Sequence, residues 1–438
     1  MLTPRHGRAR AQALLGGLCL FLSAVEYLIP KPLPFMRIGL ANLPLLLALD
    51  ILGPADYFLL ALLKTAGQGI ISGSLFSYVF LFSLAGTFSS AALMYGIRRV
   101  MGKRAGFTGI GCAGAMLSNG VQLLLARYFV FGAGLRFLVP PFLASGFISG
   151  AALGLFCETF CRRSQWYAKH SGNASGRPYP GGNEIASAPA TEEAVSVPSA
   201  PPFPPRRQAA EARRLLRRRQ WNSLFSGGGL FAAFLLMALL FLCNKSTPSR
   251  ISQFIFFCFL AWLSGKKIMP LTTTLIMAGI VFCSLLVPYG KVLAVWGPLR
   301  ITEGSLWGGL GKALSLEGLV MLSAACVKTT PNLSGGLGRP GALLGESFRM
   351  LELMRERRGL IRRGRVIEGI DSLMLELDAA LPAAPVQTGG PREKHSRYVN
   401  SRNVKSILLP AGMAALAAAA GMLPAAIGAL PMRFILSP

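Results

Sequence analysis

The chain is poor in the residues on which most enzyme chemistry depends. Among its 438 residues are three histidines, His6, His170 and His395, all in polar or terminal segments. Neither a HExxH zinc motif nor a histidine-centred catalytic triad fits that pattern. The aspartates are never neighbours and stand at positions 50, 56, 371 and 378. They therefore do not form the carboxylate cluster that holds magnesium on a diphosphate.

Charged residues are also scarce, at 14% of the chain, against about 25% in an ordinary soluble domain. Hydrophobic residues make up 52%, and the mean hydropathy is +0.50. Several apolar stretches approach the ~20 residues that cross a bilayer. The clearest are 75–97, 109–131, 223–243 and 269–288. The composition excludes an ordinary soluble enzyme and predicts an all-α polytopic membrane protein.

Acidic residues are few beside basic ones, 18 against 45, which gives a net charge of +27. The basic residues fall in short loops and two polar segments, rather than in a folded polar domain with interleaved aromatics. Nucleic-acid binding is therefore not expected. The distribution follows the positive-inside rule and favours contact between cytosolic segments and anionic membrane lipid.

No CxxC motif occurs among the eight cysteines, most of which lie inside apolar runs. We expect them to pack as small apolar residues rather than to form disulfides or bind metal. The N-terminal segment has the basic start and apolar core of a signal peptide. Because its run is long, Glu26 interrupts its end and no convincing small-residue cleavage site follows, we expect an uncleaved first helix.

Residues 1–163 predict a bundle of six membrane helices. The expected spans are 11–29, 38–52, 56–71, 75–97, 107–131 and 137–160. A cytosolic N-terminus places the basic loop 98–104, Arg162 and Arg163 in the cytosol, as the positive-inside rule requires. The loop 30–37 and the turn 72–74 then lie outside.

Residues 164–219 predict a disordered linker that ends in a basic helix. The segment 164–205 is rich in Gly, Pro, Ser and Ala and cannot bury a core. Residues 206–219, "RRQAAEARRLLRRR", carry seven arginines. We expect them either to form a helix on the membrane surface or on a partner, or to act as a stop-transfer charge cluster.

Residues 220–438 predict a second helical membrane domain of about five spans. These are expected near 223–243, 251–264, 269–288, 304–326 and 404–430. The polar region 327–403 contains an amphipathic pattern at 341–365, in which Leu344, Phe348, Leu351 and Met354 share one face. Such a cytosolic helix either lies on lipid or offers its apolar face to a partner's groove.

Polar side chains in or beside the first-half spans form the candidate solute site, because such groups are costly in a membrane. They are Glu26, Lys31, Arg37, Asn42, Ser72, Ser74, Ser77, Asn119 and Gln122. Arg37 either contacts an anionic or polar solute or anchors the chain at lipid headgroups. Asn119 and Gln122, about one helical turn apart, either line the site or form a hydrogen bond between helices.

Two glycine-rich segments predict close helix contacts. Gly146, Gly150 and Gly154 are spaced by four residues, which lets helices approach closely. The segment "WGGLGKA" (307–313) is loosely similar to a phosphate loop. Its Gly-Lys spacing fails, and Ala313 replaces the Ser or Thr that would hold magnesium. We therefore expect a helix-packing role for it.

The first half resembles a known bacterial membrane family. The resemblance lies in "RIGLANLPLLLALDILGP" (37–54), "SGSLFSYVFLFSLAGTFSSAALM" (72–94) and "GAMLSNGVQLLLARYFV" (114–130), and covers about residues 10–160. The family is named both the Gx transporter family and heptaprenyl diphosphate synthase component I. It looks like the substrate-binding S components of energy-coupling factor (ECF) transporters. Those have six helices with cytosolic ends and bind a vitamin or metabolite from outside, which implies a small-molecule solute and the bacterial cytoplasmic (inner) membrane.

The second half more loosely resembles the T component of the same transporters, in "RITEGSLWGGLGKALSLEGLVMLSAACV" (300–327) and the arginine-rich segments after it. In T components, cytosolic helices with Ala-Arg-Gly signatures dock into two ATPase subunits. The nearest matches here, 357–359 and 362–364, lack the alanine. The resemblance implies that Arg349, Arg355, Arg358 and Arg363 contact separate ATPase subunits.

The principal hypothesis is an S-like binding part fused to a T-like coupling part of an ECF-type, ATP-driven uptake system. ATP hydrolysis in partner subunits would tilt the first bundle and release the solute inward. The chain itself has no Walker motif, so we expect no catalytic residue, metal or cofactor, and ATP only on partners. The alternatives are a non-catalytic membrane component I of heptaprenyl or polyprenyl diphosphate synthesis, which recruits a soluble catalytic partner, and a membrane scaffold with no substrate.

Overall fold

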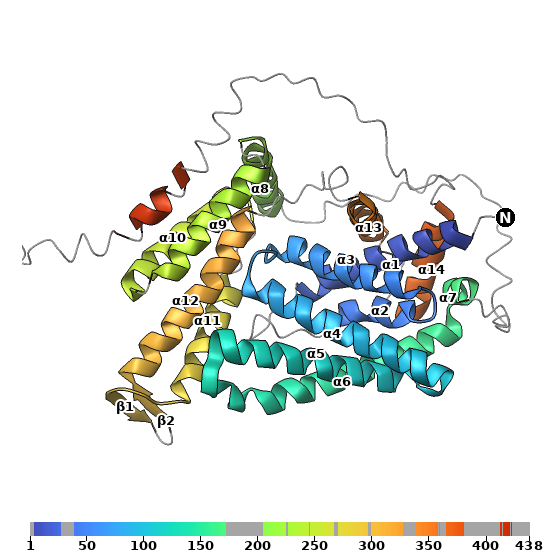
Figure 1. The fold of residues 1–438 in the computed structure, drawn as a ribbon. Coiled ribbons are helices and arrows are strands. Elements are labelled where there is room, and N and C mark those ends of the chain that lie inside the picture. The colour runs from blue at the N-terminus through green and yellow to red at the C-terminus, as the bar shows by residue number, and fades with distance from the viewer. Residues whose placement is uncertain are drawn as a thin grey trace, which may run out of the picture.

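The computed structural model describes nine uninterrupted stretches, residue 359 and a few further residues near the C-terminus. These are 4–27, 39–171, 205–224, 227–244, 246–266, 270–296, 299–326, 338–357, 359, 365–380, 412–413, 415–420 and 422. Within them the chain is almost entirely helical, and five helices are long and apolar enough to cross a membrane (Figure 1). The expected all-α polytopic membrane class is confirmed.

The first half contains four long membrane-type helices, one of intermediate length and several short elements. The long ones are α1 (Pro4–Tyr27), α4 (Tyr78–Met101), α5 (Phe107–Ala126) with its π-helical extension η3 (Arg127–Phe131), and α6 (Val139–Arg163). The others are η1 (Leu40–Asn42), α2 (Leu43–Ala48), α3 (Pro54–Ser72), η2 (Gly102–Arg104), η4 (Gly132–Phe137) and α7 (Gln165–His170).

The second predicted span, 38–52, is wrong as a full-length membrane helix. Only η1 and the six-residue α2 are helical there, and six residues rise about 9 Å, far less than a bilayer core of about 30 Å. Gly39, with φ of 85°, begins the segment, and Gly53 with Pro54 starts a new helix. The chain still returns along the bundle, because Gln12 of α1 donates to the Asp56 carbonyl at the start of α3.

Small residues bring α5 and α6 together, as their spacing predicted. A Cβ on Gly150 would lie 2.7 Å from the carbonyl oxygen of Gly111, and one on Gly154 would lie 2.4 Å from the Cα of Thr108. Both neighbours are backbone atoms, which cannot move aside as a flexible side chain can. The two helices are therefore in contact through their main chains.

The second half consists of helices and a small hairpin. Its elements are α8 (Pro205–Leu224), α9 (Gly227–Cys243), α10 (Thr247–Leu263), α11 (Pro270–Leu285), β1 (Val292–Trp296), β2 (Leu299–Thr302), α12 (Glu303–Cys326), α13 (Gly338–Glu356) and α14 (Val366–Ala380). The antiparallel hairpin β1–β2 was not expected from the sequence. Of the last predicted span, 404–430, only 412–413, 415–420 and 422 are described, all of them helical.

Helices α9–α12 run obliquely to the long helices of the first half (Figure 1). The α3–α4 turn therefore meets the C-terminal part of α12, where the Phe76 backbone N–H donates to Ser323 at 3.0 Å. The sequence predicts that this turn lies outside and that the polar region after α12 lies in the cytosol. If all of these helices ran parallel to the bilayer normal, an external turn and a cytosolic helix end would lie about 30 Å apart. The contact follows from the oblique crossing.

Helices α13 and α14, expected in a coupling region of the second domain, pack on the first half. The apolar face predicted for α13 is present, with Leu344, Leu351 and Met354 buried. It lies against α1, where a Cβ on Gly17 would be 2.4 Å from that of Met350. The apolar face of α13 therefore packs on α1 of the same chain rather than in the groove of a partner protein.

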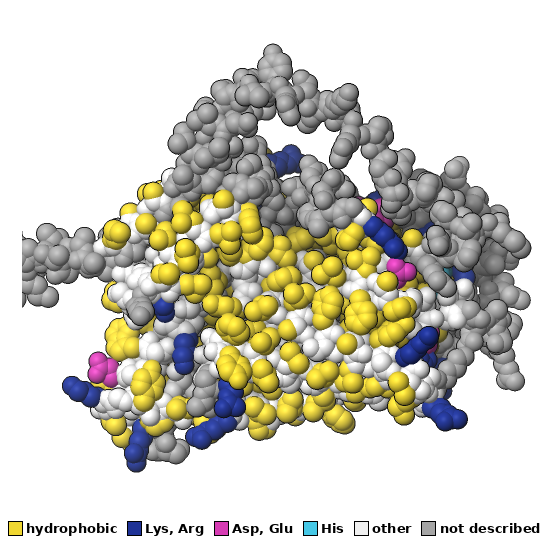
Figure 2. All heavy atoms as spheres, viewed as in Figure 1, with side chains coloured by type: hydrophobic (Ala, Val, Ile, Leu, Met, Phe, Trp, Pro, Cys, Tyr) yellow, Lys and Arg dark blue, Asp and Glu magenta, His cyan; other side chains and the backbone are white. Residues whose placement is uncertain are grey.

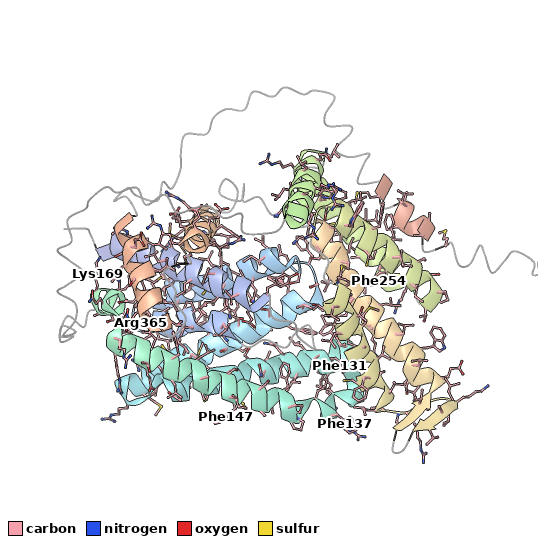
Figure 3. The ribbon with its side chains drawn as sticks, turned by 180° about the vertical axis from the view of Figure 1, so that it is seen from behind. Phe131, Phe137, Phe147, Lys169, Phe254 and Arg365 are labelled. Carbon is pink, nitrogen blue, oxygen red and sulfur yellow. The ribbon has the colours of Figure 1, made fainter. Side chains whose placement is uncertain are left out.

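Hydrophobic side chains cover most of the face seen in Figure 2, and basic side chains gather at its two ends. From behind, Phe131 and Phe137 lie where the α5–α6 connection approaches α11, whereas Phe147 projects from the outer side of α6 (Figure 3). Phe147 is 55% exposed. An apolar outer surface of this kind suits contact with lipid.

Candidate functional site

A small polar cavity of about 40 Å³ lies inside the first-half bundle. We call it the bundle cavity. Its polar lining side chains come from α1, η1 and α3–α6 and include Glu26, Asn42, Lys64, Gln68, Thr87 and Gln122. A cavity of this volume holds a few water molecules, so a larger solute requires the lining side chains to move.

Four residues of the predicted solute site line this one cavity: Glu26, Asn42, Asn119 and Gln122. They come from α1, η1 and α5, which are separated by up to 96 positions in the sequence. The structure thus brings together polar groups that the sequence identified only one by one. Whether they bind a solute stays a prediction.

Lys64 is the lining residue that sequence analysis missed. It lies in the middle of α3, is 5% exposed, and donates to Asn42 Oδ1 and, at 3.3 Å, to Thr87 Oγ1. A lysine inside the apolar run "YFLLALLKTAGQGII" was a usable signal, because ionisable groups within membrane segments mark functional sites. Gln68, one turn further on, lines the same cavity.

Glu26 supplies the carboxylate of the bundle cavity. Its side chain is 1% exposed, and Oε1 accepts a hydrogen bond from the Gly39 backbone N–H at 3.3 Å. Gly39 adopts a left-handed conformation, with φ of 85°, that favours glycine. The end of α1 and the start of η1 are therefore held together at the cavity, which contains one acid and one amine.

Helix α4 presents Ser83, Thr87 and Ser90 to the cavity at spacings of four and three, so they share one helix face. Ser90 Oγ and Gln68 Oε1 are buried and have no hydrogen-bond partner among the described residues. Buried polar atoms are normally paired with protein or water. These two are available to a water molecule or a polar solute.

Asn119 and Gln122 make different contacts from α5. Asn119 Nδ2 donates to the Phe142 carbonyl of α6 at 2.9 Å, which is an inter-helix bond, whereas Gln122 Nε2 donates to Ser118 within α5 at 3.0 Å. A Cβ on Gly86 of α4 would lie 2.7 Å from Gln122 Nε2. Glycine at that position leaves room for the glutamine amide beside the cavity.

The serines of the α3–α4 turn do not line the bundle cavity. Ser72 and Ser74 share a hydrogen bond of 2.7 Å between their hydroxyls, and Ser77 donates to the Ser74 carbonyl at 2.7 Å. These bonds shape the turn locally. A role for the three serines in solute binding stays a prediction.

The remaining predicted site residues divide into two groups. Lys31, Arg37, Arg358 and Arg363 lie outside the described residues. Arg349 and Arg355 are exposed on α13, and Arg349 lies 3.6 Å from Glu346. They are accessible to a partner, and their role in coupling stays a prediction.

The bundle cavity combines several kinds of polar group. One carboxylate, one amine, amides and hydroxyls converge there, and they suit a charged or strongly hydrogen-bonding molecule. Within the described part of the chain, no group of three histidine, cysteine, aspartate or glutamate side chains is placed to hold a metal ion.

Two family models match separate parts of the chain. Residues 229–329 match a family described as Domain of unknown function (DUF8519), which spans α9 to α12. No curated protein and no solved structure matches the chain. Residues 15–160 match the family described as heptaprenyl diphosphate synthase component I, from α1 to α6. That match covers the first-half bundle, about a third of the chain.

Proposed function

We propose that this chain is a non-catalytic membrane component of polyprenyl diphosphate synthesis that recruits a soluble catalytic subunit. The observation that carries the proposal is the match of residues 15–160 to the component I family. This was the alternative hypothesis from the sequence. It assigns the condensation of allylic and isopentenyl diphosphates to the partner.

The aspartates support a non-catalytic role, because all four are engaged in structural contacts. Asp50 pairs with Arg98 at 2.6 Å and Asp56 with Arg339 at 2.7 Å. Asp371 accepts backbone N–H bonds at the start of α7, and Asp378 pairs with Lys169 at 2.7 Å. Carboxylates occupied by arginine, lysine and amides are poor ligands for magnesium on a diphosphate.

The test is purification of the tagged full-length chain from membranes of its host, followed by an elongation assay. The assay supplies an allylic diphosphate and radiolabelled isopentenyl diphosphate. We expect the purified material to form longer polyprenyl diphosphates, through a soluble aspartate-rich synthase that co-purifies. Material without this activity and without such a synthase would overturn the proposal.

A second candidate, the substrate-binding and coupling parts of an ECF-type uptake system, is favoured by two specific observations. Polar groups converge in the bundle cavity, and the first-half helices lie obliquely to α9–α12, as a tilted binding bundle would. In this candidate the exposed α13 arginines contact nucleotide-binding subunits that hydrolyse ATP.

The same purification separates the two candidates. The uptake candidate predicts that nucleotide-binding subunits co-purify with the chain and that the double variant Arg349→Glu, Arg355→Glu loses them. The control Arg300→Glu, at an exposed residue of the hairpin, should keep them. It also predicts a small metabolite retained by the purified chain and identified by mass spectrometry. Neither result is expected of a synthase component.

A further inference from the structure

A second, larger cavity of about 510 Å³ lies where the first half of the chain meets the second. We call it the junction cavity. Tyr78 at the start of α4 and Phe129 in η3 line one side, and residues of α9, α10 and α12 line the other. It shares no lining residue with the bundle cavity, and its volume is that of a small-molecule site.

Two cations line the junction cavity, Arg250 of α10 and Lys312 of α12. Arg250 Nε donates to the Asn244 carbonyl at 2.6 Å and Nη1 to Ser315 Oγ at 3.2 Å, so both acceptors are neutral. These bonds fix the guanidinium beside the cavity. Lys312 is exposed.

No negative charge in the described part of the chain compensates these two cations. No aspartate or glutamate is among the described residues that line the cavity. Neither Arg250 nor Lys312 forms an ion pair with a described residue. Two neighbouring cations without a counter-charge attract an anion, and a guanidinium suits the oxygens of a phosphate group.

The glycine-rich segment 307–313 shapes one wall of the cavity. A Cβ on Gly308 would lie 1.9 Å from the Tyr289 hydroxyl oxygen, and one on Gly304 would lie 2.7 Å from the Tyr289 ring. Glycine at both positions lets the ring lie against α12, where it lines the cavity. This segment holds no phosphate loop, but its Lys312 and two of its glycines line the cavity.

Apolar side chains border the cations. Phe129 and Trp307 are each 49% exposed, and Leu242 is 42% exposed, and all three line the cavity. Exposed aromatic rings at the ends of apolar helices are typical of the membrane–water interface. On the surface, basic side chains gather towards the end that carries the β1–β2 hairpin (Figure 2). A molecule that contacts both the cationic and the apolar lining residues has a charged headgroup and an apolar tail.

We propose that the junction cavity binds the phosphate-bearing headgroup of an anionic membrane lipid. Arg250 and Lys312 contact the phosphate, the Tyr289 hydroxyl donates to it, and Phe129 and Trp307 contact the beginning of the acyl chains. A bound lipid then lies between the two halves of the chain and touches both. The proposal does not depend on either function considered above, because neither uses this cavity.

The test measures lipid binding to the full-length protein in neutral detergent after delipidation. Phosphatidylglycerol, phosphatidylcholine and inorganic phosphate are titrated separately, and bound lipid is counted by native mass spectrometry. We expect phosphatidylglycerol to bind at least tenfold more tightly than phosphatidylcholine. We also expect millimolar inorganic phosphate to leave the bound phosphatidylglycerol in place.

Lys312→Gln is the decisive variant, because the Lys312 side chain is exposed and forms no hydrogen bond or ion pair with a described residue, so we expect its replacement to leave the fold unchanged. We expect it to weaken phosphatidylglycerol binding about tenfold, and Arg250→Gln to do so at least as much. Arg300→Gln, on the same end of the molecule but outside the cavity lining, should bind as the wild type does.

Three results would overturn the proposal. Equal affinity for phosphatidylglycerol and phosphatidylcholine would show that the negative charge of the headgroup is not recognised. Unchanged binding in Lys312→Gln would place the lipid elsewhere. Displacement of phosphatidylglycerol by inorganic phosphate at equal concentration would assign the cavity to a free anion.

Discussion

Lys64, in the middle of α3, donates a hydrogen bond to the side-chain oxygen of Asn42, where η1 runs into α2. The same amine lies 3.3 Å from Thr87 Oγ1 on α4. A buried amine in a membrane bundle is costly unless its donors are satisfied. One nitrogen atom therefore joins three elements of the bundle across the cavity.

This relationship predicts different outcomes for two substitutions of Lys64. Lys64→Met keeps the aliphatic stem and removes the charge, so we expect the free energy of unfolding to change by less than about 1.5 kcal/mol. Lys64→Glu places a second carboxylate beside Glu26 in the cavity and should cost roughly 2–4 kcal/mol. Thermal unfolding in detergent measures both. An equal loss of stability in the two variants would contradict the polar role of this lysine.

The main-chain contact between α5 and α6 predicts that Gly150 does not tolerate a methyl group. Gly150→Ala places a Cβ 2.7 Å from the Gly111 carbonyl oxygen and 2.9 Å from Cα of Cys112, and it should destabilise the protein by roughly 1–3 kcal/mol. Gly120→Ala, on α5 with no atom within 4 Å of its Cβ, is the matched control. We expect the control to be neutral or slightly stabilising in the same unfolding assay.

Asp371 of α14 caps α7, and its removal should loosen both elements. It accepts backbone N–H bonds from Gln165 at 3.0 Å and Trp166 at 3.1 Å. Asp371→Ala should cost about 1–2 kcal/mol and increase amide hydrogen exchange in 165–171 and 366–380. Glu368→Ala, which breaks only an exposed pair with Arg365, is expected to change neither quantity measurably. Faster exchange in both variants would argue against capping.

Lys266, in the loop between α10 and α11, predicts a pH dependence of stability. Burial, with Arg218 nearby, lowers the pKa of Lys266 from 10.5 to about 8. Between these values the unfolded chain keeps a proton that the folded chain has released, so stability rises as the pH increases from about 8 to 10.5. Below pH 8 both states hold the proton, and the cost of burying the charge is constant.

The measurement is the difference in unfolding temperature between wild type and Lys266→Met at pH 7, 8, 9 and 10. We expect the variant to be more stable at pH 7, by an amount on the order of 1 kcal/mol, and the difference to shrink as the pH rises. Lys291→Met, at an exposed hairpin lysine, controls for general loss of charge. A pH-independent difference for Lys266→Met would contradict the lowered pKa.

Long apolar runs made much of the first half predictable. The expected spans 75–97, 107–131 and 137–160 agree closely with α4, α5 with η3, and α6, because each run is bounded by turn residues or basic residues. The second span was overestimated, because nine apolar residues around Pro44 look like a membrane helix although they are buried in the protein core. Hydropathy alone does not separate these two environments.

The candidate site was predictable in part for a similar reason. Glu26, Asn42, Asn119 and Gln122 stand out as polar residues near or within apolar spans, and all four line the bundle cavity. Lys64 lies in the middle of α3, away from the external ends of the spans at which most of the candidate site residues were predicted. The convergence of these residues depends on helix packing, which no single stretch of sequence encodes.

The docking of α13 on α1 has no local signal at all. Gly16 and Gly17 form the surface that Ser347 and Met350 cover, and these pairs are separated by more than 300 positions. The amphipathic pattern of α13 predicted an apolar face in need of cover. Only the folded structure identifies the partner as the first helix of the same chain.

That pairing also sets an order of events during synthesis. At roughly 5–20 residues per second, the ribosome needs about 16 to 62 s to make the residues between α1 and α13. During that time α13 does not yet exist, so the α1 surface at Gly16 and Gly17 lacks the contacts that it makes in the folded protein, whether or not α1 has already entered the bilayer. The first helix to emerge is thus among the last to be completed. A nascent chain stalled before residue 338 should therefore expose a surface of α1 that the mature protein hides.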